Sequence, residues 1–102
     1  LYPRKGTIAP GADADVIVIN PNAKRTLTVA SQKCKADYNN WEGLEVTGIP
    51  VVTISRGTVV FRCSVVDGIA QYGDAQITVA EGHGKFVERQ PFNPYVYGRI
   101  HN

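Results

Sequence analysis

The feature that most constrains the fold is a run of four consecutive branched apolar residues, Val16-Ile17-Val18-Ile19. Successive side chains of a β-strand point to opposite faces of a sheet, so this run presents apolar groups to both faces. Such a strand is typical of the centre of a sheet that is covered on both sides. A chain of 102 residues with short flanking strands can hardly supply both covers. We therefore expect part of the covering structure to lie outside this chain.

Turn-forming residues recur at short intervals, and the runs between them are rich in Val, Ile and Thr, as in short strands. No window combines a helical period with a cap, so we expect at most a single helical turn near residues 36–44. The sequence predicts a mainly β fold. The expected strands cover residues 6–9, 15–20, 26–29, 51–55, 58–63 and 76–80.

The clearest local element is a hairpin that turns at Arg56-Gly57. Gly57 allows the positive φ of a tight turn, whereas Arg56 is modestly strained if the turn is type I′. With these two residues as the loop, the expected pairs are Ser55 with Thr58, Ile54 with Val59, Thr53 with Val60, and Val52 with Phe61. This register places Val52, Ile54, Val59 and Phe61 on one apolar face.

Composition excludes several classes of protein. Eleven basic and nine acidic residues give a formal charge of +2, and the two signs are interleaved along most of the chain. The one basic stretch free of acids (Lys24, Arg25, Lys33, Lys35) is interpreted as a solvated loop face, so no nucleic-acid partner is expected. No apolar run approaches the roughly 18 residues of a membrane helix. The chain begins at Leu1 and contains no methionine, so we expect a cleaved product or a fragment.

Local signatures of catalysis are weak. His83 and His101 lack the spacing of metal ligands and are interpreted as exposed imidazoles. Asp13 is explained by turn formation before the strand that Asp15 begins. Cys34 and Cys63 could pair in an oxidising compartment, but free thiols in a reducing cytosol are the preferred interpretation. We predict no catalytic, cofactor-binding or metal-binding residue in this chain.

Longer motifs carry a family resemblance. Residues 5–19, KGTIAPGADADVIVI, resemble the strand, turn and strand that follow the catalytic barrel of metal-dependent amidohydrolases. Further motifs resemble the C-terminal part of the dihydropyrimidinase family, in that family's order and across nearly the whole chain. These are LYPRKG at 1–6, DYN at 37–39, WEG at 41–43, GIPVVTISRG at 48–57, and EGHGKF at 81–86 with Arg89, Pro91-Phe92 and Tyr97.

The same segment is similar in the non-enzymatic dihydropyrimidinase-related proteins, the collapsin response mediator group. Arg56 resembles the enzymes more closely, because the non-enzymatic relatives tend to have glutamine there. One departure is an apparent insertion at 63–76, which an enlarged hairpin loop would absorb cheaply.

The resemblance implies a parent enzyme that opens dihydrouracil, dihydrothymine and hydantoins in pyrimidine catabolism. Two zinc ions bridged by a carboxylated lysine would activate the attacking hydroxide. All of those ligands would belong to the preceding barrel, so this chain should be inactive alone.

The resemblance also implies an architecture. Residues 1–80 would belong to the small composite β-sandwich domain that flanks the amidohydrolase TIM barrel. Residues 81–102 would form an extended aromatic tail that contacts a neighbouring subunit of a cytoplasmic homotetramer. The expected partners are thus the barrel and the N-terminal strands of the parent. One alternative is the same segment of a non-enzymatic scaffold protein. A further alternative is an independent small β module that binds a partner through its aromatic tail.

Overall fold

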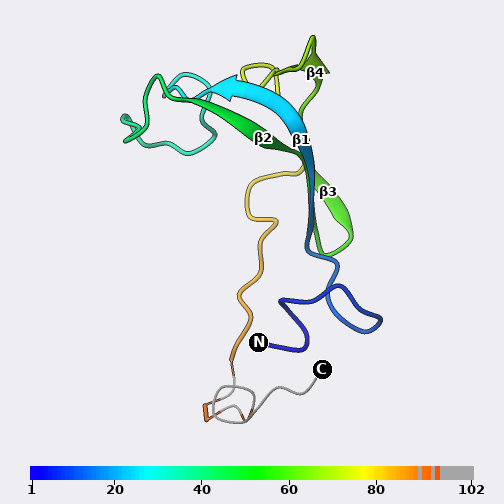
Figure 1. Cartoon of the computed structure of the whole chain (residues 1–102). Coiled ribbons are helices and arrows are strands. Elements are labelled where there is room, and N and C mark those ends of the chain that lie inside the picture. Colours follow the sequence, from blue (N-terminus) through cyan, green and yellow to red (C-terminus); the bar gives the residue numbers. More distant parts are fainter. Residues whose placement is uncertain (90, 93, 95–102) are drawn as a thin grey trace.

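The computed structural model describes residues 1–89, 91, 92 and 94, and within residues 1–89 it contains six strands and no helix (Figure 1). Two long strands, β1 (Val16–Thr26) and β2 (Glu45–Ser55), dominate the fold. The shorter strands are β3 (Thr58–Arg62), β4 (Val65–Val66), β5 (Ile69–Ala70) and β6 (Gln76–Ile77). The predicted mainly β fold is confirmed.

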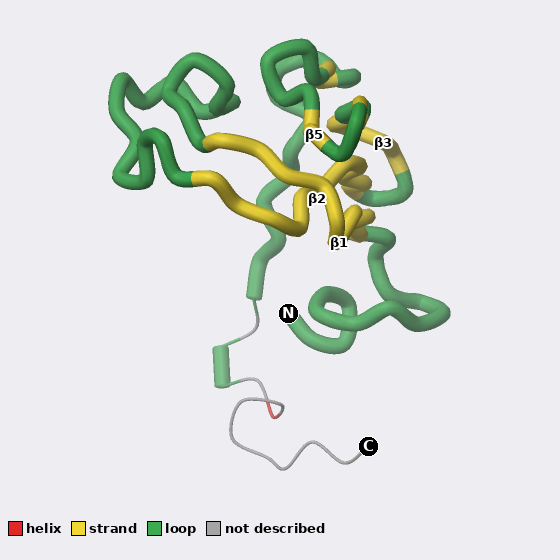
Figure 2. The backbone as a smooth tube through the Cα atoms, turned by 45° about the horizontal axis from the view of Figure 1, so that its top comes forward, coloured by secondary structure: helices red, strands yellow, loops and turns green. Residues whose placement is uncertain are grey.

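All six strands form one sheet in the order β4-β5-β1-β2-β3-β6. Neighbouring strands are antiparallel except β1 and β5, which pair in parallel at Lys24 and Ile69. The backbone tube in Figure 2 shows β1 and β2 running together along most of their length. Since β1 is the third of six strands, the predicted central position of residues 15–20 is confirmed.

β1 is longer than predicted because the Asn20-Pro21-Asn22 break is accommodated inside the strand. The regular pairing with β2 shifts between Asn20 and Lys24, which places Pro21 in a bulge. Proline cannot donate to a ladder, so a bulge is where a strand tolerates it. Opposite it, Gly48 adopts φ 91°, and a β-carbon there would lie 3.9 Å from the Pro21 carbonyl oxygen.

The β2–β3 hairpin confirms the predicted turn and half of its register. Arg56 and Gly57 have φ of 47° and 81°, as a type I′ turn requires. Ser55 pairs with Thr58 and Ile54 with Val59, as expected, but a bulge then pairs Thr53 with Phe61 and Val52 with Arg62. The register predicted for Thr53 and Val52 was therefore wrong, because β3 contains one extra residue at this point.

Two other predicted strands differ from the structure. Residues 6–9 are not a strand, since Gly6 has a positive φ and no strand of the described residues lies alongside them. Of the strand predicted at 26–29, Thr26 ends β1 and Leu27 still bonds the Leu44 carbonyl oxygen through its N–H at 2.9 Å. Residues 28 and 29 turn away, and the hydroxyl groups of Thr28 and Ser31 lie 2.8 Å apart. Residues 36–44, where at most a single helical turn was expected, contain hydrogen-bonded turns, including Leu44 N–H to the Trp41 carbonyl at 3.0 Å.

Two further elements differ from the prediction near the C-terminal side of the sheet. β6 is shorter than the expected 76–80, although the Thr78 N–H still bonds the Val60 carbonyl oxygen at 3.0 Å. Residues 63–76, which were expected to be a loop, contain β4 and β5. These two-residue strands are joined by Asp67-Gly68, and the Gly68 carbonyl accepts the Lys24 N–H of β1 at 2.8 Å.

The core is small. Its buried members are Ala23, Ile49, Cys63 and Ala70, and no large side chain is completely buried among the described residues. The chain exposes 8003 Å², whereas a compact monomer of this mass exposes about 5,700 Å². Among the described residues, none forms a helix of the length and hydrophobicity needed to span a bilayer.

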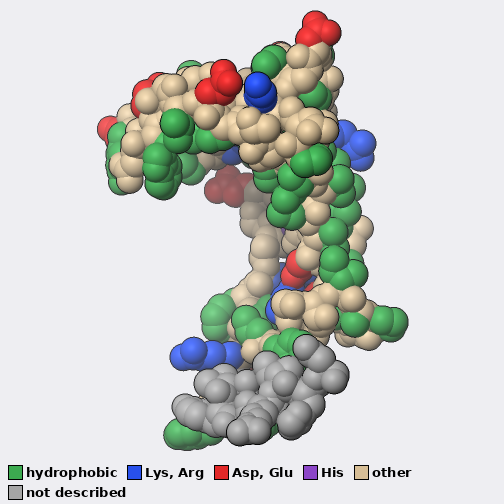
Figure 3. Space-filling view, viewed as in Figure 1, with side chains coloured by type: hydrophobic (Ala, Val, Ile, Leu, Met, Phe, Trp, Pro, Cys, Tyr) green, Lys and Arg blue, Asp and Glu red, His purple; other side chains and the backbone are tan. Residues whose placement is uncertain are grey.

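The central strand is not covered. Ile17, Val18 and Ile19 of β1 are 54%, 46% and 50% exposed, although adjacent residues point to opposite faces. Figure 3 shows apolar side chains gathered along the strands and around the β1–β2 loop. The described residues therefore leave both faces of the strand that most needs burial open to solvent.

Candidate functional site

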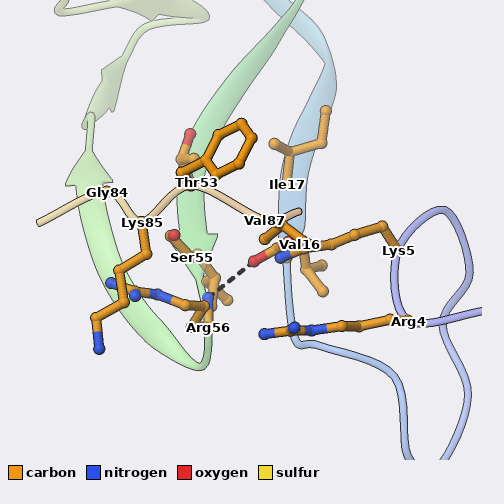
Figure 4. Close-up of a pocket in the computed structure, with 13 residues that line it drawn as sticks. Arg4, Lys5, Val16, Ile17, Thr53, Ser55, Arg56, Gly84, Lys85 and Val87 are labelled. Atoms are coloured by element: carbon orange, nitrogen blue, oxygen red, sulfur yellow. Dashed lines mark hydrogen bonds and ion pairs between the residues drawn. The ribbon is translucent and has the colours of Figure 1, made fainter. Parts of the chain in front are cut away.

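A groove lies where the N-terminal segment, the start of β1, the end of β2 and the C-terminal strap (residues 82–89) meet. It encloses about 520 Å³. Figure 4 shows Arg4 and Lys5 entering from the N-terminal segment, while Arg56 and Lys85 come from the β2–β3 turn and the strap. We call this the junction groove.

Two carboxylates organise one wall of the junction groove. Asp13 accepts a hydrogen bond from Nε of Arg4 at 2.8 Å and pairs with Nζ of Lys5 at 2.9 Å. Asp15 pairs with the same lysine and also accepts the backbone N–H of Arg56 at 2.9 Å. The Pro10-Gly11 turn brings these residues together, since the Asp13 N–H bonds the Arg4 carbonyl oxygen at 2.9 Å.

These contacts favour the charged forms of Asp13, Asp15 and Lys5. Lys5, and then the Arg56 N–H, lower the pKa of Asp15, while Lys5 and Arg4 lower the pKa of Asp13. The same bonds to Asp15 and Asp13 raise the pKa of Lys5. A carboxylate with a lowered pKa is a poor general acid at neutral pH. The pair therefore serves to hold the chain together rather than to transfer protons.

Arg56 joins three segments. Its backbone N–H is bound to Asp15, and its guanidinium donates to the carbonyl oxygen of His83 in the strap. This second use was not predicted from the sequence. The His83 ring is half-buried, not exposed as predicted, and its Nε2 is enclosed without a hydrogen-bond partner. His101 lies outside the described residues.

The described residues do not assemble a metal site. No three His, Cys, Asp or Glu side chains among them are grouped to hold a metal ion. Cys63 is buried and Cys34 is exposed, and both are free thiols. The described residues therefore do not fit the zinc ions that the family resemblance implies.

A second hollow, also about 520 Å³, lies against the β1–β2 loop. The Arg25 guanidinium stacks over the Tyr72 ring at 3.8 Å and bonds Oγ of Ser31 at 3.0 Å. The Tyr72 hydroxyl donates to the Pro50 carbonyl at 2.9 Å, and burial raises its pKa. Tyr38 and Trp41 of the loop are exposed at the hollow. This arrangement contains no nucleophile with an adjacent base, so it resembles a packing surface.

Known proteins are similar in sequence to this chain along nearly its whole length. No protein-family model matches the chain. Rat dihydropyrimidinase is 42% identical over 100 residues, and human dihydropyrimidinase-related protein 5 is also 42% identical over 100 residues. The chain is a homologue of one segment of the dihydropyrimidinase family. Each alignment covers 98% of this chain, but 17% of the rat enzyme and 16% of the human relative.

Solved structures of D-hydantoinases are similar to this chain in both sequence and fold. The D-hydantoinase (dihydropyrimidinase) of a Thermus species superposes with a TM-score of 0.63 at 42% identity, over 82% of this chain and 16% of that chain. A D-hydantoinase from Bacillus sp. AR9 gives a TM-score of 0.57 at 46% identity, over 71% and 15%. The fold and the family resemblance are thereby confirmed. The chain spans about a sixth of the length of these dihydropyrimidinase-family proteins.

Proposed function

We propose that this chain is the C-terminal, non-catalytic part of a dihydropyrimidinase-like cyclic amide hydrolase. The parent would open dihydrouracil, dihydrothymine and hydantoin rings in pyrimidine catabolism in the cytoplasm. The observation that carries the proposal is the uncovered central strand, because Ile17, Val18 and Ile19 are about half exposed on two faces. A chain that matches about a sixth of its relatives is expected to lack covering structure.

In this proposal the chain completes the composite β-sandwich beside the barrel. The partners are the parent's barrel and N-terminal strands, which cover β1, while two zinc ions and a carboxylated lysine belong to the barrel. The C-terminal tail contributes to a homotetramer. Phe86 is 92% exposed and Phe92 is also exposed, so the described residues leave these aromatics available for a neighbour. Tyr95 and Tyr97 lie outside the described residues.

A chimera tests the proposal. The matched segment of the Thermus D-hydantoinase is replaced by this chain, and hydantoin hydrolysis and oligomer mass are measured. We expect the chimera to assemble and to hydrolyse hydantoin, while the 102-residue chain alone does not hydrolyse dihydrouracil with or without zinc. Turnover by the purified chain alone would contradict the non-catalytic role.

A matched pair of variants locates the interface. Val18→Asp places a charge on the face of β1, whereas Val66→Asp places the same charge on another exposed valine, in β4. We expect Val18→Asp to reduce both assembly and activity of the chimera, because it would bury an unpaired carboxylate. Val66→Asp should leave both unchanged. Equal effects of the two substitutions would show that β1 is not the covered surface.

A second candidate is the same segment of a non-enzymatic scaffold protein. The observation in its favour is that dihydropyrimidinase-related protein 5 is as similar to this chain, at 42% identity, as rat dihydropyrimidinase. Sequencing the residues that precede Leu1 in the gene distinguishes the two. An intact set of barrel histidines and a lysine that can be carboxylated favours the enzyme, and their loss favours the scaffold.

A further inference from the structure

The junction groove concentrates the positive charge of the chain. Four basic side chains line it: Arg4, Lys5, Arg56 and Lys85. Two carboxylates oppose them, Asp15 in the lining and Asp13 beside it. Four cations against two anions leave two surplus positive charges, equal to the formal charge of +2 of the whole chain. The groove is therefore a local positive site on a nearly balanced protein.

The two carboxylates in this region are already paired with cations. Lys5 pairs with both Asp13 and Asp15, and Nε of Arg4 pairs with Asp13. The backbone N–H of Arg56 donates to the other oxygen of Asp15. Lys85, in contrast, has no hydrogen-bond or ion-pair partner among the described residues. The remaining N–H groups of the Arg56 guanidinium are also uncommitted beyond its one bond to the His83 carbonyl.

Neutral donors lie in the same lining. Thr53 and Ser55 of β2 line the groove, and neither hydroxyl has a side-chain partner among the described residues. Figure 4 shows Lys85 and Arg56 crossing the region beside the β2–β3 turn, with Arg4 reaching toward that turn from the N-terminal segment. The groove thus gathers guanidinium, ammonium and hydroxyl donors around a space in which the carboxylate acceptors are already occupied.

We propose that the junction groove binds an oxyanion of the phosphate class. A phosphate dianion matches the two surplus charges, and its oxygens accept from the fork of Arg56, the ammonium of Lys85 and the hydroxyl of Ser55. A monocarboxylate would neutralise half of that charge. Val16 and Ile17, at the start of β1, also line the groove, so the cover proposed above for β1 would border this site.

Calorimetric titration of the full chain tests this proposal, with inorganic phosphate in one arm and glycerol phosphate in the other, at constant ionic strength in chloride. We expect saturable binding of one phosphate group per chain. Tighter binding of glycerol phosphate would identify a phosphorylated compound as the ligand, and equal binding would identify the free ion. The absence of saturable binding in both arms would overturn the proposal.

Two lysine variants give the matched comparison. Lys85→Gln removes one groove cation, whereas Lys35→Gln removes an exposed cation of the β1–β2 loop that does not line the groove. We expect Lys85→Gln to weaken phosphate binding about tenfold, the effect of losing one charge-assisted hydrogen bond, and Lys35→Gln to leave it unchanged. Circular dichroism verifies that both variants keep the β spectrum. Equal weakening by the two variants would show diffuse attraction to net charge and would overturn a defined site.

Discussion

The carboxylate of Asp15 accepts a hydrogen bond from the backbone N–H of Arg56 at 2.9 Å, although the two residues are 41 positions apart. Asp15 stands immediately before β1, and Arg56 is the first residue of the β2–β3 turn. The bond therefore fixes the start of the central strand to the far end of its partner. Because the other oxygen of Asp15 binds Lys5, the same carboxylate also ties the N-terminal segment to the sheet.

Asp15→Asn should lower the stability of the chain. The substitution removes the ion pair with Lys5 and weakens the acceptor for the Arg56 N–H, while the size of the side chain is kept. The midpoint of urea denaturation measures the effect. Asp74→Asn is the control, since Asp74 is exposed and has no side-chain partner among the described residues. If both variants unfold at the same midpoint, the Asp15 bonds do not contribute to stability.

The stability of the chain should depend on pH at both ends of the range. Asp13 and Asp15 have pKa values lowered from the ordinary 3.8, so their contribution is present above that pH and is lost as the pH falls through the lowered values. The pKa of Lys5 is raised from 10.5, so its contribution is present below that pH and is lost as the pH rises through the raised value. Solvent screening keeps both effects modest.

Denaturation midpoints measured from pH 2 to 12 test this dependence. The combined variant Asp13→Asn and Asp15→Asn should flatten the acid limb of the profile, because the titrating groups are gone. The alkaline limb should also weaken, since Lys5 has then lost both partners. If the acid limb is unchanged in the double variant, other carboxylates are its cause.

Tyr72 offers a prediction that separates a hydrogen bond from packing. Tyr72→Phe removes the donor to the Pro50 carbonyl but keeps the ring against Phe61 and Arg25, so we expect a loss of about 1 kcal/mol. Tyr72→Ala also removes the ring and should cost about 3 kcal/mol. Urea denaturation measures both free energies of unfolding. Equal losses would show that the ring adds nothing beyond the hydroxyl.

The sequence predicts those parts of the fold that depend on local chemistry. Val16 to Ile19 identifies the central strand because four branched residues in a row suit few other environments. Arg56-Gly57 identifies the hairpin turn because glycine accepts positive φ. The ion pairs of Lys5 with Asp13 and Asp15 were not predicted, although the Pro10-Gly11 turn that brings them together is a local signal.

Other parts depend on contacts between distant segments and were not predicted. The bulge opposite Gly48 shifts the register, and it depends on both strands at once. β4 and β5 contain two residues each, too few to show a period. The junction groove unites Arg4, Arg56 and Lys85 from three segments, so no spacing along the chain reveals it.

Gly48 and Gly73 provide two alanine substitutions with opposite expected signs. Gly48 has φ 91°, where a β-carbon is strained, so Gly48→Ala should destabilise the chain by about 1 kcal/mol or more. Gly73 has no positive φ and open space around a built β-carbon, so Gly73→Ala should stabilise the chain by about 0.5 kcal/mol. Thermal denaturation of both variants checks the signs. A neutral Gly48→Ala would mean that the bulge relaxes without cost.

The isolated chain should self-associate through β1. Ile17, Val18 and Ile19 are exposed on a central strand, and exposed apolar sheet surface favours association between copies. Light scattering should give an apparent mass above 11.1 kDa that rises with concentration. Ile17→Lys should lower that mass by charging the surface, whereas Ile8→Lys, at a more exposed isoleucine outside the sheet, should not. A constant mass of 11.1 kDa at high concentration would show that the open faces of β1 do not bind one another.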